Sequence, residues 1–578
     1  MVTVVRISLN NLVSAVMLTA LLSLGVFASL ALNSESGTID VKTVSITDRN
    51  IELSGLLYKP KSAATDSPAG AIVIAHGISG SKEMMSSIGL ELARKGYVCL
   101  CLDLYGHGKS QGTINDGQKE PSFGVYAAIQ YLKSQPYVNT SMLGLIGHSL
   151  GAGAVRAAAF KEPQIGALVL IAGGVGEVTQ GQQYGVLNSS YPRNLLVIVG
   201  KYDILFEIND LTAKQLPAVF GTQQVIPEVL YGSFSSQTAR KLLLPPTTHL
   251  FEPIDQTVIS ESIDWMQKTL GKNPVHKDSD MGFVYPQREA AVAIALAALV
   301  GLTCLSFFPI GGLIKADFHR IPTRTLSASS KKWRLYGIWA MLNLALFVPM
   351  FAVGSAVPFP PLVFGASIAW WTMSTGLIGL TLLAKFSEKM VGRKIRIREE
   401  LTASFNQKDL FTSIILFAFL FTITTLLAVL FNFNFRVISP ILRDLSSANR
   451  ALLFPAFIPF FVSYFVAESL YMHKLTNMRT REESNWLNLR NYVSTILGKI
   501  FPFVLLLCLQ YIPQIAFGIW VFPSFLGFLL ELFWLIIPIF AIASSFSWWF
   551  YNKTGNVVYG ALFNALLMSW IAAAVFPF

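Results

Sequence analysis

Long stretches without a single charged side chain most restrict what this chain can fold into. They comprise residues 7–34, 290–314, 335–384, 410–435, 451–467, 500–530 and 554–578. A helix needs about 20 apolar residues to cross the hydrocarbon core of a bilayer, whereas a core helix of a soluble protein rarely needs more than about 12 in a row. Because the whole chain is 53% hydrophobic and 13% charged, we predict an integral membrane protein.

Proline-containing breaks at Pro358–Pro361 and Trp520–Pro523 divide the longer stretches into separate spans. We therefore predict the N-terminal segment plus eight spans, at about 289–312, 335–356, 361–384, 410–433, 451–472, 498–518, 524–548 and 555–577. The N-terminal segment is either a retained anchor or a signal peptide cleaved after Ser29-Leu30-Ala31. Its apolar centre, Leu12–Leu32, exceeds the about 7–15 residues of a signal peptide, which favours the anchor.

Basic residues predict the orientation of these spans. Lys and Arg are concentrated in the loops at 315–334, 385–398 and 474–490, and Arg6 precedes the first span. By the positive-inside rule these segments are cytoplasmic, so residues 35–286 face the other side. This topology accounts for the net charge of +11, and we predict no nucleic-acid partner. The expected domains are an anchor (1–34), an extracytoplasmic domain (35–272), a linker (273–288) and a transmembrane domain (289–578).

The extracytoplasmic segment alternates between strand and helix patterns. Two alternating runs at 41–47 and 51–58 predict an antiparallel pair, and short apolar runs follow at 71–75, 97–102, 142–146, 167–171 and 195–199. Helical patterns separate the first four of these runs, at about 82–95, 121–134 and 150–160. Buried parallel strands joined by helices give such continuous apolar runs. We predict an α/β fold with a mostly parallel sheet.

Ser149 stands at a turn typical of an exposed nucleophile. Gly147-His148-Ser149-Leu150-Gly151 fits the pattern G-x-S-x-G, and it joins a predicted strand to a predicted helix that begins with small residues. Glycines let the strand and helix approach closely while the serine occupies a strained turn. The sequence therefore predicts a nucleophile elbow at Ser149.

A serine nucleophile needs a base, and the base needs a carboxylate that orients it. Asp203 follows the strand at 195–199 closely, whereas Glu207 and Asp210 stand further from it. His249 follows the last predicted strand, 240–244. We predict Ser149, Asp203 and His249 as nucleophile, orienting acid and base.

These residues, in this order, resemble the α/β-hydrolase superfamily. Ile74–Gly80 resembles its oxyanion loop and Asp103–Ser110 its Asp-x-x-Gly-x-Gly-x-Ser turn, so the resemblance covers about 41–270. It lies nearest the branch of dienelactone-hydrolase-like esterases and serine aminopeptidases. The resemblance implies an α/β-hydrolase fold, no metal or organic cofactor, and oxyanion donors at the backbone N–H groups of Leu150 and Ile78.

Three further histidines and one insertion complete this part of the sequence. His76 and His107 do not lie where the family has its base and are expected to be structural. His76, Gly77 and His148 are expected to line the pocket. The usual helical lid is missing from the short connection at 172–194, while an insert at 204–236 could cover the pocket instead.

The predicted transmembrane domain contains polar residues within its spans, which are costly there and often functional. They are Glu468, His473, Lys499, Gln510, Glu531 and Asn564. Ala467–His473 and Thr554–Asn564 resemble the CAAX-endopeptidase-like membrane family, with Ser469, His473 and Gly560 at positions where that family has Glu, Arg and His. These changes imply a degenerate, non-catalytic relative.

The sequence thus predicts a membrane-bound serine hydrolase that cleaves ester or amide substrates, whether small molecules, lipids or peptides. Two other functions stay open. The spans could form a binding or transport protein with the hydrolase domain as its receptor module, or they could form an active intramembrane protease. A complete set of Ser149, Asp203 and His249 argues against the receptor, and the changed carboxylate and histidine positions argue against the protease.

Overall fold

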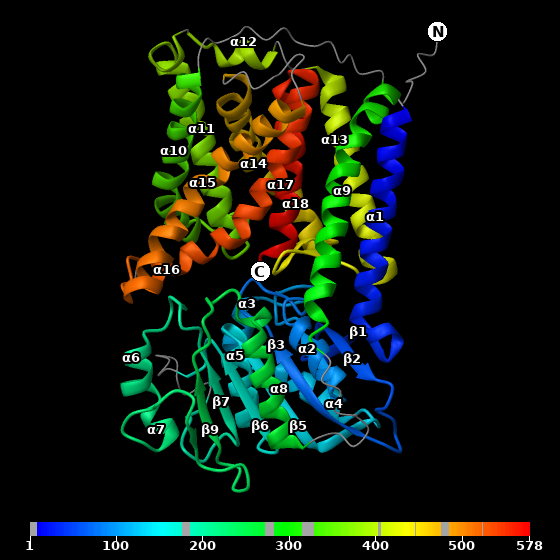
Figure 1. Ribbon diagram of the computed structural model, residues 1–578, viewed down its shortest axis with the longest axis vertical. Coiled ribbons are helices and arrows are strands. Elements are labelled where there is room, and N and C mark those ends of the chain that lie inside the picture. Colours follow the sequence, from blue (N-terminus) through cyan, green and yellow to red (C-terminus); the bar gives the residue numbers. More distant parts are fainter. Residues whose placement is uncertain are drawn as a thin grey trace.

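A computed structural model describes residues 9–175, 185–271, 282–314, 329–392, 394–402, 406–445, 447–475, 485–522 and 524–578. The basic loop at 315–328 and much of the predicted linker, 272–281, lie outside these residues, as do Arg6 and part of the 172–194 connection. Figure 1 shows two parts stacked along the long axis, a bundle of long helices and a sheet flanked by shorter helices.

The sheet has nine strands in the order β1-β2-β4-β3-β5-β6-β7-β9-β8. Their bounds are β1 Ile39–Asp48, β2 Ile51–Pro60, β3 Ala69–Ala75, β4 Val98–Leu102, β5 Val138–His148, β6 Ala167–Ile171, β7 Leu195–Ile198, β8 Leu230–Tyr231 and β9 Arg240–Leu243. β1 and β2 pair antiparallel, as predicted, and the pairs from β4 and β3 through β9 are parallel. The α/β-hydrolase fold class predicted from the sequence is confirmed.

Helices bury both faces of this sheet, which explains the continuous apolar strands. Ile72 and Ile74 share a core with α2 (Ser86–Arg94) and α8 (Gln256–Leu270), whereas Ala71, Val73 and Ala75 share the opposite core with α4 (Val125–Lys133) and α5 (Leu150–Lys161). Successive side chains of a strand point to opposite faces, so a strand that is covered on both sides must be apolar at every position. A further short helix, α3, spans Ile114–Lys119.

Nine helices among the described residues are long and apolar enough to cross a membrane, in agreement with the predicted spans. Ten of the described helices make up these nine candidate spans, because α16 and α17 together form one of them. They are α1 Leu9–Asn33, α9 Tyr285–Leu313, α10 Ser329–Ala356, α11 Gly365–Val391, α13 Gln407–Phe431, α14 Ala448–Ser469, α15 Asn485–Phe517, α16 Ser524–Glu531, α17 Phe533–Thr554 and α18 Val557–Val575. We call this set the apolar bundle. α16 and α17 break at Leu532 within what the sequence predicted as one span.

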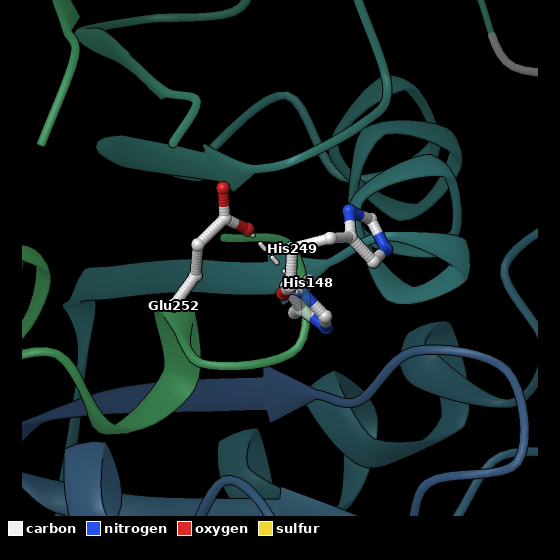
Figure 2. A group of neighbouring side chains, drawn as sticks. All are labelled: His148, His249 and Glu252. Carbon is white, nitrogen blue, oxygen red and sulfur yellow. Dashed lines mark hydrogen bonds and ion pairs between the residues drawn. The ribbon is translucent and has the colours of Figure 1, made fainter. Parts of the chain in front are cut away.

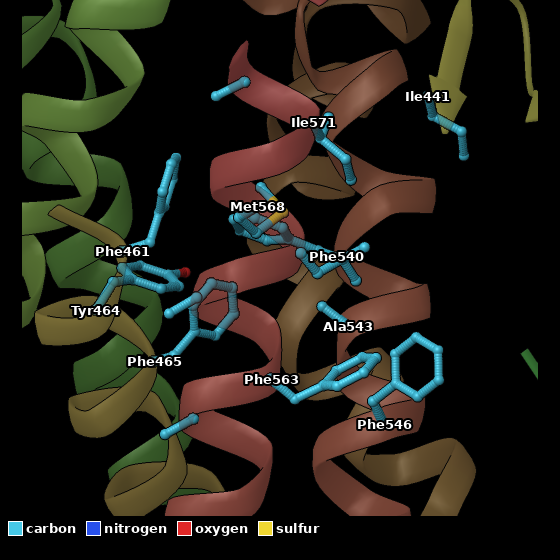
Figure 3. Close-up of a cluster of buried hydrophobic side chains, with 14 of the residues drawn as sticks. Ile441, Phe461, Tyr464, Phe465, Phe540, Ala543, Phe546, Phe563, Met568 and Ile571 are labelled. Carbon is cyan, nitrogen blue, oxygen red and sulfur yellow. The ribbon is translucent and has the colours of Figure 1, made fainter. Parts of the chain in front are cut away.

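Aromatic side chains fill the interior of the apolar bundle. Figure 3 shows Tyr464 and Phe465 of α14 beside the α18 helix that carries Phe563 and Met568. α14 is followed by one turn of π-helix, Leu470–Lys474. α12 (Ile397–Thr402) lies at the end of the bundle that is remote from the sheet (Figure 1).

Buried arginines join the apolar bundle to the sheet part. Arg288, at the start of α9, donates to Asn33 Oδ1 at 2.8 Å and to Ser87 Oγ at 3.1 Å. Asn33 ends α1, and α1 packs along α9 (Figure 1). Arg436, in the β10 strand (Phe435–Arg436) that pairs with β11 (Pro440–Leu442), makes two hydrogen bonds with Glu289, at 2.7 and 2.8 Å.

Arg450, near the start of α14, makes the second connection. It is 1% exposed, and it donates to the carbonyl oxygens of Ala573 at 2.9 Å, Phe576 at 2.8 Å and Gly106 at 3.1 Å. Gly106 belongs to the sheet part, so one guanidinium connects α14, the end of α18 and a loop of the sheet. The last residue, Phe578, accepts from Ile114 N at 2.9 Å.

Replacing Arg450 with alanine should destabilise this connection strongly. The carbonyl oxygens of Ala573 and Phe576 would lose their bonds from Arg450, at a cost of about 1–3 kcal/mol for each group left unsatisfied, whereas Gly106 O would keep its bond from Phe578 N at 3.2 Å. We expect Arg450→Ala to lower the thermal unfolding midpoint in detergent by several degrees. Arg396→Ala, which removes an exposed partner of Glu399, is the control and should leave the midpoint unchanged. Equal midpoints for the two variants would contradict this account.

Candidate active site

Ser149 occupies a strained turn between β5 and α5. Its φ of 53° and ψ of −116° lie outside the regions that L residues favour, and its N–H donates to Ile171 O at 2.8 Å. The turn requires small neighbours, because a Cβ on Gly151 would lie 2.4 Å from the carbonyl oxygen of Ala75. Local strain of this kind persists where the surrounding structure holds it in place, and here it leaves Ser149 half-buried at the surface of the site.

The structure brings together all three residues of the predicted triad. His249 Nε2 lies 3.1 Å from Ser149 Oγ, and His249 Nδ1 lies 2.8 Å from Asp203 Oδ2. Asp203 follows β7 and His249 follows β9, so the loops meet Ser149 at the carboxyl edge of the parallel strands. Glu207 and Asp210, the alternative acids, lie further along the insert, and Asp210 pairs with Lys214 at 2.8 Å.

The electrostatics of the site favour a charged His249. Burial disfavours the imidazolium, but the charge and hydrogen bond of Asp203 outweigh it, so the pKa of His249 lies above its ordinary value. His76, His107 and His148 differ, since burial lowers the pKa of each ring. The position of Asp203 therefore distinguishes His249 from the other histidines of the sheet part.

His148 and Glu252 form a second layer behind His249 (Figure 2). His148 Nε2 lies 3.0 Å from the carbonyl oxygen of His249 and 3.3 Å from Glu252 Oε2. Glu252 Oε1 accepts from Gly200 N at 2.6 Å, which connects it to the loop that carries Asp203. Burial raises the pKa of Glu252 well above its ordinary value. Sequence reasoning did not identify Glu252, because no local pattern distinguishes it.

Potential ligand atoms of His148, His249 and Glu252 lie within 4.8 Å of one another. Such a group could hold a metal ion. However, both ring nitrogens of His249 already face Asp203 and Ser149, and His148 Nε2 faces a carbonyl oxygen. We interpret the group as an acid–base arrangement with supporting hydrogen bonds.

Backbone N–H groups at the predicted oxyanion positions lie beside Ser149. Leu150 is the first residue of α5, and the first N–H groups of a helix have no partner within it. Ile78 lies just past β3 and is half-exposed, like Leu150. Gly77 packs against the elbow, since a Cβ there would lie 3.1 Å from Ser149 Cβ.

His76 and His148 were expected to line the pocket, but the structure buries both rings, at 0% and 2% exposure. His76 Nε2 accepts from Leu104 N at 3.1 Å, and its ring packs on His107 at 5.1 Å between centroids. Nearby, Asp103 pairs with buried Lys82 at 2.5 Å. The Asp103–Ser110 turn thus contributes a buried polar network that supports the loops.

The apolar bundle covers the loops that carry the acid and the base. Ile204, next to Asp203, is fully buried within the bundle's hydrophobic cluster. Phe251, two residues after His249, packs edge-on against Trp534 of α17, with ring centroids 5.1 Å apart. Alongside them a cavity of about 680 Å³ separates the acid loop from α15, lined by residues that include Tyr202, Ile208, Leu244, Gln514, Ile515 and Trp520.

Beyond Ile204 and Ile208, much of the 204–236 insert packs against the sheet part. Its short helices, α6 (Ile208–Asp210) and α7 (Pro217–Phe220), flank one π-helical turn, Leu211–Gln215. Leu211, Leu216 and Phe220 are buried in the same core as α4 and α5. These side chains therefore extend the core of the sheet part.

Polar residues inside the bundle mostly face one another. Glu468 pairs with Lys499 at 2.9 Å, and both side chains are about 1% exposed or less. His473 stacks on Tyr551, and Asn564 Nδ2 donates to Ala543 O at 2.8 Å and to Ser547 Oγ at 2.7 Å. A Cβ on Gly560 would lie 2.9 Å from Ser547 Cα, so a larger side chain there would push the helices apart.

Comparison with known proteins agrees with the fold of the sheet part. Residues 66–198 match the family described as serine aminopeptidase, S33. The chain is 32% identical over 133 residues to the uncharacterized protein YcjY of Escherichia coli, covering 22% of this chain and 43% of that protein. It is also 29% identical over 119 residues to bis(hydroxyethyl) terephthalate hydrolase of Streptomyces coelicolor. This match covers 20% of this chain and 36% of that protein.

Similar solved structures include the esterase Pf2001 of Pyrococcus furiosus, with 18% sequence identity and a TM-score of 0.31. The match covers 41% of this chain and 96% of that chain. Another is the dienelactone hydrolase of Anabaena variabilis, with 18% identity and a TM-score of 0.29. That match covers 40% of this chain and 99% of the other chain. The chain spans less than half the length of the two curated relatives. Residues 66–198 are therefore similar to a family of hydrolases.

Proposed function

We propose that this protein is a membrane-bound serine hydrolase that cleaves an ester or amide bond through an acyl-enzyme. The observation that carries this proposal is the continuous chain of contacts from Asp203 through His249 to Ser149, at 2.8 and 3.1 Å. A half-buried serine on a strained turn with a histidine in hydrogen-bond reach is suited to nucleophilic attack. The terephthalate ester hydrolase among its relatives supports an ester as substrate.

The mechanism follows from these positions. Ser149 Oγ attacks the carbonyl carbon while its proton passes to His249 Nε2, and Asp203 stabilises the imidazolium that forms. The backbone N–H groups of Leu150 and Ile78 stabilise the oxyanion, each donor being worth about 2.7–4 kcal/mol in comparable enzymes. His249 then donates the proton to the leaving group, and a water molecule, activated by His249, releases the acyl group from Ser149.

We further propose that the helices of the apolar bundle span the bilayer, with residues 35–272 on the extracytoplasmic side. The nine long apolar helices support the spans, and the three basic loops together with Arg6 support the orientation. The hydrogen bond between Arg288 and Asn33, at 2.8 Å, supports placing the last residue of α1 and the start of α9 on the same side of the bilayer.

We also propose that substrates reach Ser149 from the bilayer or its interface, as an acyl lipid or a lipidated peptide would. The cavity between the acid loop and α15 supports this route, because its lining combines apolar side chains with polar and charged ones, as an amphipathic substrate requires. The apolar residues include Ile208, Ile515 and Trp520, and the polar and charged ones include Lys201, Glu207 and Gln514. The burial of Ile204 among bundle side chains also supports it, since the acid loop and the spans are continuous there. An amphipathic substrate could keep its acyl chain among the spans while its carbonyl group meets Ser149.

The polar sites of the bundle favour a degenerate, non-catalytic relative of the CAAX-endopeptidase-like family. A carboxylate that activates water must be available to it, whereas Glu468 is paired with Lys499. The tight packing at Gly560 also excludes the histidine of that family. Neither feature supports the intramembrane protease as a second function.

Substitution of the triad should separate catalysis from folding. Ser149→Ala should abolish labelling by a fluorophosphonate and ester turnover while leaving the unfolding midpoint near that of the wild type, because alanine fits the small elbow. His249→Ala should lower turnover by at least about 10³-fold. The matched control is His76→Ala, the other buried histidine near the elbow. A loss of turnover in His76→Ala as large as in His249→Ala would show that the base has been assigned wrongly.

Single cysteines test the orientation. A Ser62→Cys variant should react with an impermeant maleimide added to intact cells, whereas a Ser329→Cys variant should react only after the membrane is permeabilised. The expectation rests on the basic loop that precedes residue 329 and on Arg6. The four native cysteines are first replaced by serine or alanine, and this background must stay unlabelled. Reversed labelling would place Ser149 in the cytoplasm.

Substrate chain length tests delivery from the bilayer. The full-length protein in mixed micelles should hydrolyse a long-chain lipid ester with a higher kcat/KM than a water-soluble short ester. Ile515→Ser, which changes the lining of the cavity beside the acid loop, should reduce the rate with the long ester selectively. Ile512→Ser, at a similarly exposed residue of α15, is the control. An equal loss of rate with both esters in Ile515→Ser would refute this route. A higher kcat/KM of the wild type for the short ester would refute it as well.

A further inference from the structure

The end of α16 contacts the loop that carries the predicted base. Glu531 is the last residue of α16 and is 4% exposed. Trp534, three residues further along, packs on Phe251 at 5.1 Å between ring centroids. One turn before Glu531, a Cβ on Gly527 would lie 3.0 Å from Ile204 Cδ1. This segment therefore lies against the loops of both His249 and Asp203.

The Glu531 carboxylate is held from one side and faces the triad on the other. Tyr511 of α15 donates a hydrogen bond to Oε1. Oε2 is buried without a hydrogen-bond partner among the described residues. The carboxylate interacts electrostatically with His249, Asp203 and the backbone amide of Leu250. A buried carboxylate oxygen without a hydrogen-bond partner lowers the stability of the fold. We therefore expect Glu531 to have a role other than stabilising the fold.

Other titratable groups also face His249, and they differ in the charge they carry. Asp203 bonds Nδ1 at 2.8 Å, and the His148 ring lies 4.9 Å away between centroids. Burial favours the neutral forms of His148 and Glu252. Tyr511 faces Glu531 directly. Among the described groups around His249, Glu531 is a second carboxylate, besides Asp203, that favours the imidazolium when it is ionised.

We propose that Glu531 is a positioning residue for the hydrolase reaction, through which the apolar bundle stabilises the imidazolium form of His249. The proposal rests on the proposed serine hydrolase activity and adds a group from outside the α/β domain to its active site. During attack, the proton from Ser149 Oγ moves to His249 Nε2, and the new positive charge interacts with Asp203 and with Glu531. In a site from which water is largely excluded, a second carboxylate at short range stabilises that charge more than it would in water.

The test measures the pH dependence of the rate at which a small fluorophosphonate labels Ser149 in the full-length protein. Labelling requires neutral His249, so its rate rises with pH through the pKa of His249. Glu531→Gln removes a negative charge and should lower that pKa, moving the midpoint to lower pH by roughly 0.5–1 unit. The same change weakens the imidazolium, so the rate at the high-pH plateau should fall by roughly 3–10-fold.

Three further variants complete the experiment. Glu531→Ala, a second neutral variant, should move the midpoint in the same direction. Glu531→Asp keeps the charge and should leave the midpoint closer to that of the wild type. Glu289→Gln removes a carboxylate that bonds Arg436 at the same junction and does not act on His249, so this variant should not move the midpoint.

Two results would overturn the proposal. Reduced labelling of Glu531→Gln and Glu531→Ala at an unchanged midpoint would indicate a role in packing alone. An equal shift in Glu289→Gln would indicate a general effect of disturbing the junction. Absence of labelling in the wild type would instead refute the serine hydrolase itself, so the two failures can be told apart.

Discussion

Polar groups that are buried where the sheet meets the apolar bundle must find partners there, and this requirement fixes how the two parts are arranged. Arg288 and Arg450 each bond a group of the sheet part, and Arg436 bonds Glu289 of α9 next to Arg288. A buried guanidinium is tolerated when its donors are satisfied. Because the Arg450 bonds reach α14, the end of α18 and Gly106 together, a change in their relative orientation would leave several buried groups unpaired.

This fixed arrangement determines the surroundings of the triad. The carboxyl edge of the parallel strands carries Ser149, Asp203 and His249, and the acid and base loops pack on α16 and α17 through Ile204 and Phe251. The site is therefore enclosed on one side by its own domain and on the other by the bundle. The bundle thus provides cover on that side of the site.

Sequence reasoning succeeded wherever the signal was local. Uncharged runs predicted the spans, and the breaks at Pro358–Pro361 and Trp520–Pro523 matched the gaps between helices. The small residues around Ser149 predicted the turn that the backbone adopts. By contrast, Glu252 and Ile204 depend on contacts made after the chain has folded, and no period or motif distinguishes them. His148 was expected at the pocket but lies beneath it, because its ring bonds the carbonyl oxygen of His249.

The two buried glutamates of the bundle show why residue type alone could not assign the rest. Both Glu468 and Glu531 were identified in the sequence as polar residues within spans. Glu468 meets Lys499 at 2.9 Å, so its charge is compensated within the bundle and stabilises helix packing. Glu531 accepts a hydrogen bond from the neutral hydroxyl of Tyr511, and no Lys or Arg pairs with it among the described residues. The difference arises from a neighbour about 280 residues away in the chain. A carboxylate that lacks a permanent cation becomes most stable when the imidazolium forms, and this links the bundle to the step in which Ser149 loses its proton.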